Sequence, residues 1–200
     1  MMETSALLAL LTYAVATSIT PGPNNMMLLA SGLNFGFARS VPHMLGIALG
    51  FGLMVLIVGV GLGALFKAYP TIHEVLRWVG GAYMLYLAWR IATAAAPKAS
   101  QKTAAKPMGF VAAAAFQWVN PKAWIMALGA IATYLPSDPT VAAVALLALV
   151  FTLVNLPCVS VWTVFGVGLQ RFLTKPSYVH AFNITMALML VLSLYPLVRP

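Results

Sequence analysis

The segment "ITPGPNNMM" (residues 19–27) interrupts an apolar stretch that begins at Ala6 and continues past Ala30. Two prolines around a glycine end a helix, because proline lacks a backbone N–H and restricts the residue before it to extended backbone. Two asparagines follow, and polar side chains are costly to place in hydrocarbon. A helix is therefore predicted to stop near Ile19 and to restart with Pro23 in its first turn, where proline is favoured.

The composition of the surrounding chain is that of an integral membrane protein. Of its 200 residues, 62% are hydrophobic and 7% are charged, whereas a soluble domain carries about 25% charged residues. The apolar residues form runs of about 20 residues or more, the length that spans a bilayer as a helix. Transmembrane β-strands are shorter, at about ten residues, and alternate in polarity, so these runs predict helices.

Six such runs predict an all-α membrane protein with six transmembrane helices. The predicted spans are 5–32, 42–66, 71–93, 109–134, 140–168 and 179–198. Short connections between the spans are typical of one compact membrane-embedded domain over residues 1–200. The first five residues hold Glu3 and no basic residue, so a cleaved signal peptide is not expected.

The basic residues predict the orientation of the chain in the membrane. With the linker 94–109 in the cytoplasm, the inside holds Arg39, Arg90, Lys98, Lys102, Lys106, Arg171 and Lys175. The outside then holds Lys67, Arg77 and Arg199, and Lys122 falls within a span. This excess obeys the positive-inside rule and places both termini on the outer, periplasmic side. The formal charge of +8 is therefore a topology signal and not an indication of nucleic-acid binding.

A linker of about 94–108 divides the chain into two halves of three spans each. The first repeat (about 1–93) and the second (about 109–200) both hold an odd number of spans, so the second half is predicted to insert upside down. Many secondary transporters have this inverted-repeat arrangement. The fourth span contains "WVNPKAW" (118–124), at the place that corresponds to the break in the first. The predicted architecture is thus two inverted three-helix repeats with broken helices 1 and 4.

Each break creates a helix N-terminus inside the membrane, with free backbone N–H groups and a partial positive charge. At the second break, Asn120 is a good N-cap and Pro121 a good first helical residue. Lys122 adds a full charge there, which is unfavourable unless an anion binds beside it. The alternative interpretation is a pair of proline kinks stabilised by neighbouring helices, with Lys122 extending to an interface. We favour a substrate site, because the breaks occupy matching places in the two halves.

The chemistry of the breaks favours a small neutral amino acid bound as its zwitterion. The helix N-termini, the asparagines and Lys122 suit a carboxylate, whereas carbonyls freed near Ile19 and Thr20 would accept an α-ammonium group. All three acidic residues fall at span ends or in connections, so no buried carboxylate is predicted for a cationic substrate or a metal ion. The predicted substrate-binding residues are Thr20, Pro21, Gly22, Pro23, Asn24, Asn25, Asn120, Pro121, Lys122 and Asn155.

Four motifs resemble, in the same order, those of the LysE/RhtB family of bacterial amino-acid exporters. They are "TPGPNN" (20–25) in the first span, "GIALGFG" (46–52) in the second, "WVGGAYMLYLAWRI" (78–91) in the third and "NPKA" (120–123) in the fourth. The resemblance covers nearly the whole chain, and residues 78–91 with "FQWVNPK" resemble in particular the cysteine and O-acetylserine exporters. It implies six spans, an inner-membrane location and efflux of amino acids or close derivatives, driven by proton exchange.

The sequence leaves more than one candidate for the residue that would carry the proton. The resemblance implies an acidic residue in the fifth span, where this chain reads "FTLVNLPCVSVW" (151–162). Asn155 there is a candidate third site residue or, as we slightly favour, an interhelical hydrogen-bonding group. His43 is the candidate proton-coupling residue, since imidazole titrates near neutral pH, although a structural role is more frequent for a lone histidine. Lys122 is the alternative.

Other functional classes fit the residues less well. A redox relay by dithiol exchange needs two cysteines, and Cys158 is the only one. A metal-dependent enzyme needs clustered ligands, whereas His43, His73 and His180 lie on different spans, so we expect no enzyme, metal or cofactor. The alternative function is a channel or an exporter of other small carboxylated metabolites, because broken helices line channels too. The expected partners are the substrate, protons and the bilayer, with a homodimer left open.

Glycine pairs in the second span predict close helix packing. Gly46 with Gly50, and Gly59 with Gly63, have the small-xxx-small spacing that lets transmembrane helices approach each other. Tight packing is the predicted role of both pairs.

Overall fold

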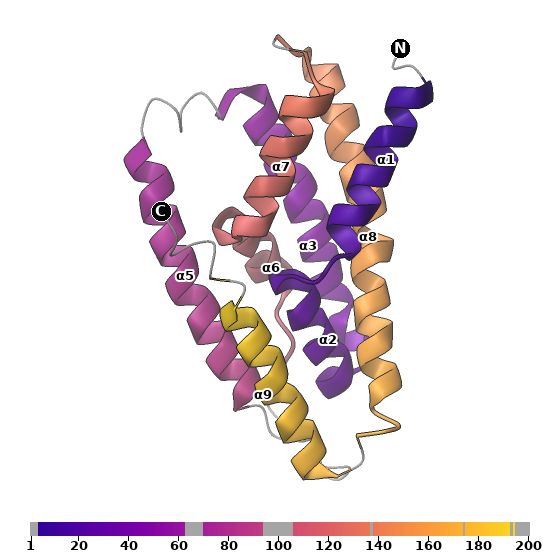
Figure 1. The fold of residues 1–200 in the computed structure, drawn as a ribbon, viewed down its shortest axis with the longest axis vertical. Helices are drawn as coiled ribbons and strands as arrows, with labels where there is room; N and C mark the ends of the chain where they lie inside the picture. Colours follow the sequence, from indigo (N-terminus) through magenta and orange to yellow (C-terminus); the bar gives the residue numbers. More distant parts are fainter. Residues whose placement is uncertain are drawn as a thin grey trace.

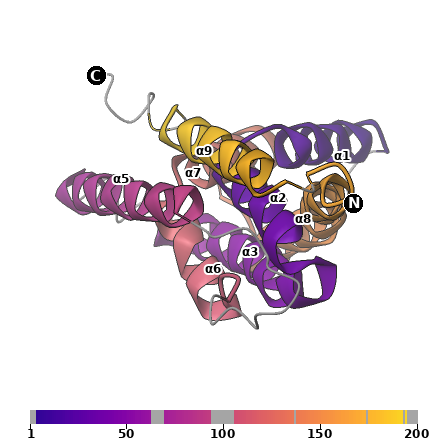
Figure 2. The ribbon, with the colours of Figure 1, turned by 90° about the horizontal axis from the view of Figure 1, so that it is seen from below.

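The apolar runs of the sequence fold into helices. The computed structural model describes residues 4–62, 70–93, 106–136, 138–173, 175–192 and 194, and every regular element among them is helical. The elements are α1 (Thr4–Ile19), α2 (Pro23–Phe35), α3 (Phe37–Ile57), η1 (Val58–Leu62), α5 (Pro70–Ala92), α6 (Phe110–Phe116), η2 (Gln117–Val119), α7 (Pro121–Tyr134), α8 (Val141–Leu169) and α9 (Pro176–Leu192). They form an elongated bundle, with α5 and α8 on opposite sides (Figures 1 and 2). The predicted all-α class is confirmed for this part of the chain.

Two of these helices are long and apolar enough to cross a membrane by themselves. They are Phe37–Gly61 and Val141–Leu169, each with a mean hydropathy of 2.4 in its most apolar window. The bent pair α1 and α2 adds a third span if it is counted as one. Helices also lie within the other three predicted ranges, while the count of six spans and the inverted repeat stay predictions.

The first break occurs at the predicted residues. Helix α1 ends at Ile19 and α2 begins at Pro23, with an angle of 56° between the two axes. Helix α2 then ends at Phe35, and its C-cap Gly36, with a φ of 80°, is the one residue between α2 and α3. Glycine favours this left-handed conformation because it has no Cβ. The helix that holds the second predicted span therefore begins at Phe37, before residue 42, since one glycine replaces the expected longer connection.

The second break is also present at the predicted residues. The short helices α6 and η2 end at Val119, and α7 begins at Pro121. Asn120 between them is extended, and its Oδ1 accepts a hydrogen bond of 3.1 Å from the backbone N–H of Lys122. Asn120 is thus the predicted N-cap, which satisfies one of the free N–H groups of the new helix.

Glycines allow helix backbones to touch at two interfaces. A methyl group on Gly50 of α3 would lie 2.5 Å from the Ala114 Cα of α6, and one on Gly46 would collide with Phe110. The close packing predicted for this glycine pair is confirmed. Gly32 of α2 meets the backbone of Thr163 in α8 in the same way. Gly59 contacts a Val144 side chain, whereas Gly63 lies outside the described residues.

The interior holds several apolar clusters around this frame. The largest joins α1, α3, α7 and α8, where the rings of Phe51 and Phe151 meet edge to face at 5.5 Å between centroids. A second cluster joins α5, α6 and α9 around Met84, Phe116 and Leu190. Phe116 of the second cluster and Ala123 of the first lie on either side of the second break, so apolar residues of both clusters flank it in the chain.

Candidate functional site

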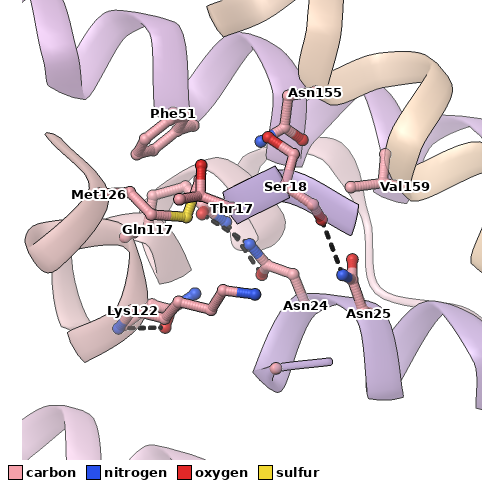
Figure 3. Close-up of a pocket in the computed structure, with 13 residues that line it drawn as sticks. Thr17, Ser18, Asn24, Asn25, Phe51, Gln117, Lys122, Met126, Asn155 and Val159 are labelled. Carbon is pink, nitrogen blue, oxygen red and sulfur yellow. Dashed lines mark hydrogen bonds between the residues drawn. The ribbon is translucent and has the colours of Figure 1, made fainter. Parts of the chain in front are cut away.

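The two helix breaks meet near the middle of the molecule and line one polar pocket (Figures 1 and 3). The lining residues are Thr17, Ser18, Gly22, Asn24, Asn25, Phe51, Gln117, Asn120, Lys122, Ala123, Met126, Asn155 and Val159. The predicted residues Gly22, Asn24, Asn25, Asn120, Lys122 and Asn155 are among them. The other predicted residues, Thr20, Pro21, Pro23 and Pro121, form the backbone of the breaks.

Lys122 connects the second break to the first. Its Nζ donates hydrogen bonds to the Thr20 carbonyl at 2.6 Å, the Thr20 Oγ1 at 3.0 Å and the Pro21 carbonyl at 3.2 Å. A cation is unfavourable at the N-terminus of α7 but favourable at the C-terminal end of α1, where the carbonyls carry partial negative charge. The charge that we expected to require a bound anion therefore has a partner within the protein.

Gly22 makes room for this lysine. A Cβ at Gly22 would lie 2.6 Å from Lys122 Cδ and 3.1 Å from its Nζ. The backbone of Gly22 is extended, with φ 177°, a conformation open to any residue. Glycine is therefore needed at this position because it has no Cβ to collide with Lys122, and not because of its backbone conformation.

Asn25 and Trp162 complete the end of α1. The Asn25 Nδ2 donates to the carbonyls of Ser18 at 2.9 Å and Thr20 at 2.8 Å, and the Trp162 Nε1 donates to the Ile19 carbonyl at 2.9 Å. The carbonyls that we expected to accept an α-ammonium group are therefore already bonded in this conformation. Asn25 is 2% exposed and stabilises the break. Sequence reasoning missed Trp162, which lies on the distant helix α8.

Asn24 pairs with a residue of the second break that sequence reasoning also missed. The Asn24 Nδ2 donates to the Gln117 Oε1 at 2.8 Å, and the Gln117 Nε2 donates back to the Asn24 Oδ1 at 3.2 Å (Figure 3). Gln117 is fully buried. The available signal was a glutamine directly before the predicted break, in an otherwise apolar span. The pair joins two segments that are 93 residues apart.

Two polar groups of the pocket have no hydrogen-bond partner within the described part of the chain. They are the Ser18 Oγ of α1 and the Asn155 Oδ1 of α8, and both are buried. An unpaired buried polar atom costs about 1–3 kcal/mol, so such atoms call for a functional explanation. A ligand that donates hydrogen bonds would satisfy both groups. The interhelical hydrogen bond that we favoured for Asn155 is not formed by this oxygen.

The free space between these side chains is about 20 Å³, which is roughly the room of one water molecule. A larger ligand must therefore displace Lys122 or separate Asn24 from Gln117. Phe51, Ala123 and Met126 of the pocket wall belong to the largest apolar cluster, so we expect these movements to involve side chains.

His43, the candidate proton-coupling residue, lies outside this pocket. It belongs to α3, is 2% exposed, and lines a second cavity farther along α2. Neither ring nitrogen has a hydrogen-bond partner among the residues that the structure describes.

Comparison with known proteins identifies relatives of the whole chain. The family model described as "LysE type translocator" matches residues 15–197. The chain is 37% identical over 196 residues to the cysteine/O-acetylserine efflux protein of Salmonella paratyphi A (strain ATCC 9150 / SARB42), covering 95% of this chain and 96% of the relative. The protein of the same name from Escherichia coli (strain K12) is 36% identical with the same coverage. No solved structure matches the chain.

Proposed function

The chain belongs to the LysE-type translocator family, and from that premise we propose that it exports small neutral amino acids or their derivatives across the bacterial inner membrane. Translocators move a substrate without transforming it, so the chain is a multi-pass membrane transporter and not an enzyme. The similar efflux proteins carry cysteine and O-acetylserine in their names, and these compounds are the first candidates for its substrate.

One observation carries the proposal: two broken helices meet at a pocket that holds unpaired polar atoms. The Ser18 Oγ and Asn155 Oδ1 can accept hydrogen bonds from the α-ammonium group of an amino acid. Lys122 can donate to the carboxylate on the other side of the same pocket. Neither Glu74 nor Asp138 lines it, which favours a substrate without a cationic side chain.

We infer that the substrate carboxylate replaces one or more of the backbone carbonyls that accept hydrogen bonds from Lys122. A carboxylate offers this ammonium group a stronger partner than the carbonyls of Thr20 and Pro21, since it carries a full negative charge and the carbonyls carry only partial charges. Moving the Lys122 Nζ toward the substrate would also enlarge the pocket. Coupling to the proton gradient is part of the proposal, and His43 is the candidate carrier of the proton.

The test uses cells that lack their own amino-acid exporters and are loaded with dipeptides. We expect faster release of cysteine or another small neutral amino acid with this protein than with an empty vector. Asn155→Leu and Lys122→Met should abolish that release at normal membrane abundance. The matched controls are Ser160→Ala, on the same helix as Asn155 and bonded to its own helix at the Leu156 carbonyl, and Lys175→Met. Both should retain it.

Two results would overturn the proposal. Release equal to that of the empty vector for the whole neutral panel would remove the amino-acid assignment, and a gain for carboxylates without an amino group would favour other metabolites. Release that does not saturate and shows no exchange between unlike substrates would indicate a channel.

A further inference from the structure

A second and larger cavity lies along α2, toward the end of the helix opposite the break. Its volume is about 630 Å³, within the range of about 300–1,000 Å³ that is usual for small-molecule sites. Its walls come from α2, α3, α5 and the residues that lead into α6. Met27 lines this cavity and Asn24, one turn earlier in α2, lines the pocket at the breaks, so the two spaces are neighbours.

The charge of this cavity is positive. Arg90 of α5 and Lys106, just before α6, line it from two sides. Neither Glu74 nor Asp138, the acidic residues within the described ranges, is part of its wall. A cavity with two cations and no acidic lining residue among those described favours an anionic group, and a carboxylate can accept from both side chains.

Two residues with buried, unpaired polar atoms also line this cavity. His43 lines it, and both of its ring nitrogens are without a hydrogen-bond partner in the described part of the chain. The Asn34 Oδ1 is likewise buried and unpaired, although the Asn34 Nδ2 donates to the Ala30 carbonyl at 2.8 Å and the Asn183 Oδ1 at 3.1 Å. These two bonds hold the amide in place, so its oxygen is positioned as a fixed acceptor.

We propose that this cavity is a second binding site for the transported compound, a small α-amino acid. Arg90 and Lys106 bind its carboxylate, the N–H of His43 adds a donor, and the Asn34 Oδ1 accepts from its α-ammonium group. Asn34 and Asn24 are about 15 Å apart along α2, so the cavity is a loading site from which the substrate advances to the breaks. This inference rests on the proposed function, because it assigns the same substrate to both spaces.

Equilibrium binding tests the inference on the full-length protein in nanodiscs of uncharged lipid, with radiolabelled O-acetylserine as the probe. We expect close to two molecules bound per chain in the wild type. The double variant Arg90→Gln/Lys106→Gln should bind close to one molecule, at the pocket of the breaks. Asn155→Leu should also bind close to one, at the larger cavity. The matched control Arg171→Gln/Lys175→Gln removes two exposed cations that line neither space and should still bind two.

Transport provides the second measurement. In loaded cells, Arg90→Gln/Lys106→Gln should raise the KM for release about tenfold, the size expected from losing a charge-assisted hydrogen bond. Its kcat should remain close to that of the wild type, because the pocket at the breaks is intact. Asn34→Leu gives an independent check at an uncharged residue, with the same rise in KM.

The possible outcomes separate the two proposals. A wild type that binds one molecule per chain, with binding and KM unchanged in the double variant, overturns the loading site and leaves the exporter. A wild type that neither binds nor releases any amino acid overturns both. If the double variant loses only the binding of an anionic phospholipid added to the nanodiscs, the cations serve a lipid headgroup and the loading site is wrong.

Discussion

The ammonium group of Lys122 lies 2.6 Å from the Thr20 carbonyl oxygen, so a residue of the second helix break completes the first. The two residues are 102 positions apart. Lys122 provides a hydrogen-bond donor to the first break, and the Thr20 carbonyl provides an acceptor for the charge at the second. Helix α1 ends with free carbonyls, and α7 carries a cation at an end that would repel it. This contact explains how a lysine can lie beside a helix N-terminus inside an apolar bundle.

Replacing Lys122 by methionine should therefore affect both stability and transport. The Pro21 carbonyl would lose its bond from Nζ and the Thr20 carbonyl would keep only the bond from Asn25, and the net loss per hydrogen bond is about 0.5–1.5 kcal/mol. We expect a lower melting temperature in detergent and no amino-acid release from cells. Lys175→Met, at an exposed position, is the control. A Lys122→Met protein that exports at the wild-type rate would show that the ammonium group has no part in the site.

Gly22→Ala tests the position of the same lysine without removing its charge. The added methyl group would lie 2.6 Å from Lys122 Cδ, so the flexible side chain must shift. We expect a fall in transport of several-fold with a stability change below about 1 kcal/mol, since only the end of a side chain moves. Gly168→Ala has open space around the new Cβ and serves as control. Equal transport by both variants would contradict the prediction.

Two asparagines of the pocket should separate stability from transport. Asn25 donates to the carbonyls of Ser18 and Thr20, and the Thr20 carbonyl also accepts from Lys122. Asn25→Leu should therefore lower the free energy of unfolding by about 1–3 kcal/mol through the Ser18 carbonyl. Asn155 leaves its buried Oδ1 unpaired, so Asn155→Leu should preserve stability and abolish release. Thermal unfolding and efflux measured on both proteins decide this. The prediction is wrong if Asn155→Leu melts earlier than Asn25→Leu.

Trp162→Phe should loosen the end of α1. The variant keeps an aromatic ring but loses the hydrogen bond from Nε1 to the Ile19 carbonyl, at a cost of about 1–3 kcal/mol. We expect faster hydrogen exchange at the α1–α2 junction and a lower melting temperature. Trp89→Phe, at a tryptophan that is 62% exposed, should change neither. Unchanged exchange in Trp162→Phe would show that the junction does not depend on this bond.

The sequence predicted the features that depend on neighbouring residues in the chain, namely where helices end and begin. Proline geometry and N-cap preference placed both breaks at the correct residues, with Pro23 and Pro121 as first helical residues and Asn120 as the cap. The helix of the second predicted span begins five residues earlier than the predicted span, at Phe37, because the chain turns at Gly36 alone. A single left-handed glycine closes that connection, and composition does not reveal it.

Side-chain partners were beyond prediction because they are set by the packing of distant segments. Nothing near Trp162 indicates that its indole caps a carbonyl 143 residues away. The cation at Lys122 was correctly identified as a charge in need of a partner, and the sequence offered an anion as the simplest one. The fold supplies backbone carbonyls instead, which only the position of α1 against α7 could show.

The glycine contacts also indicate which helices should move together during transport. A methyl group on Gly166 would collide with the Leu29 carbonyl, so α2 and α8 touch through their backbones, as do α3 and α6. Pairs in such contact cannot slide without collision, and we expect them to travel as fixed blocks. Helices α1 and α7 meet through side chains such as Tyr13 and Tyr134. If the pocket at the breaks opens during transport, we expect α1 and α7 to separate and the contact between Lys122 and Thr20 to break.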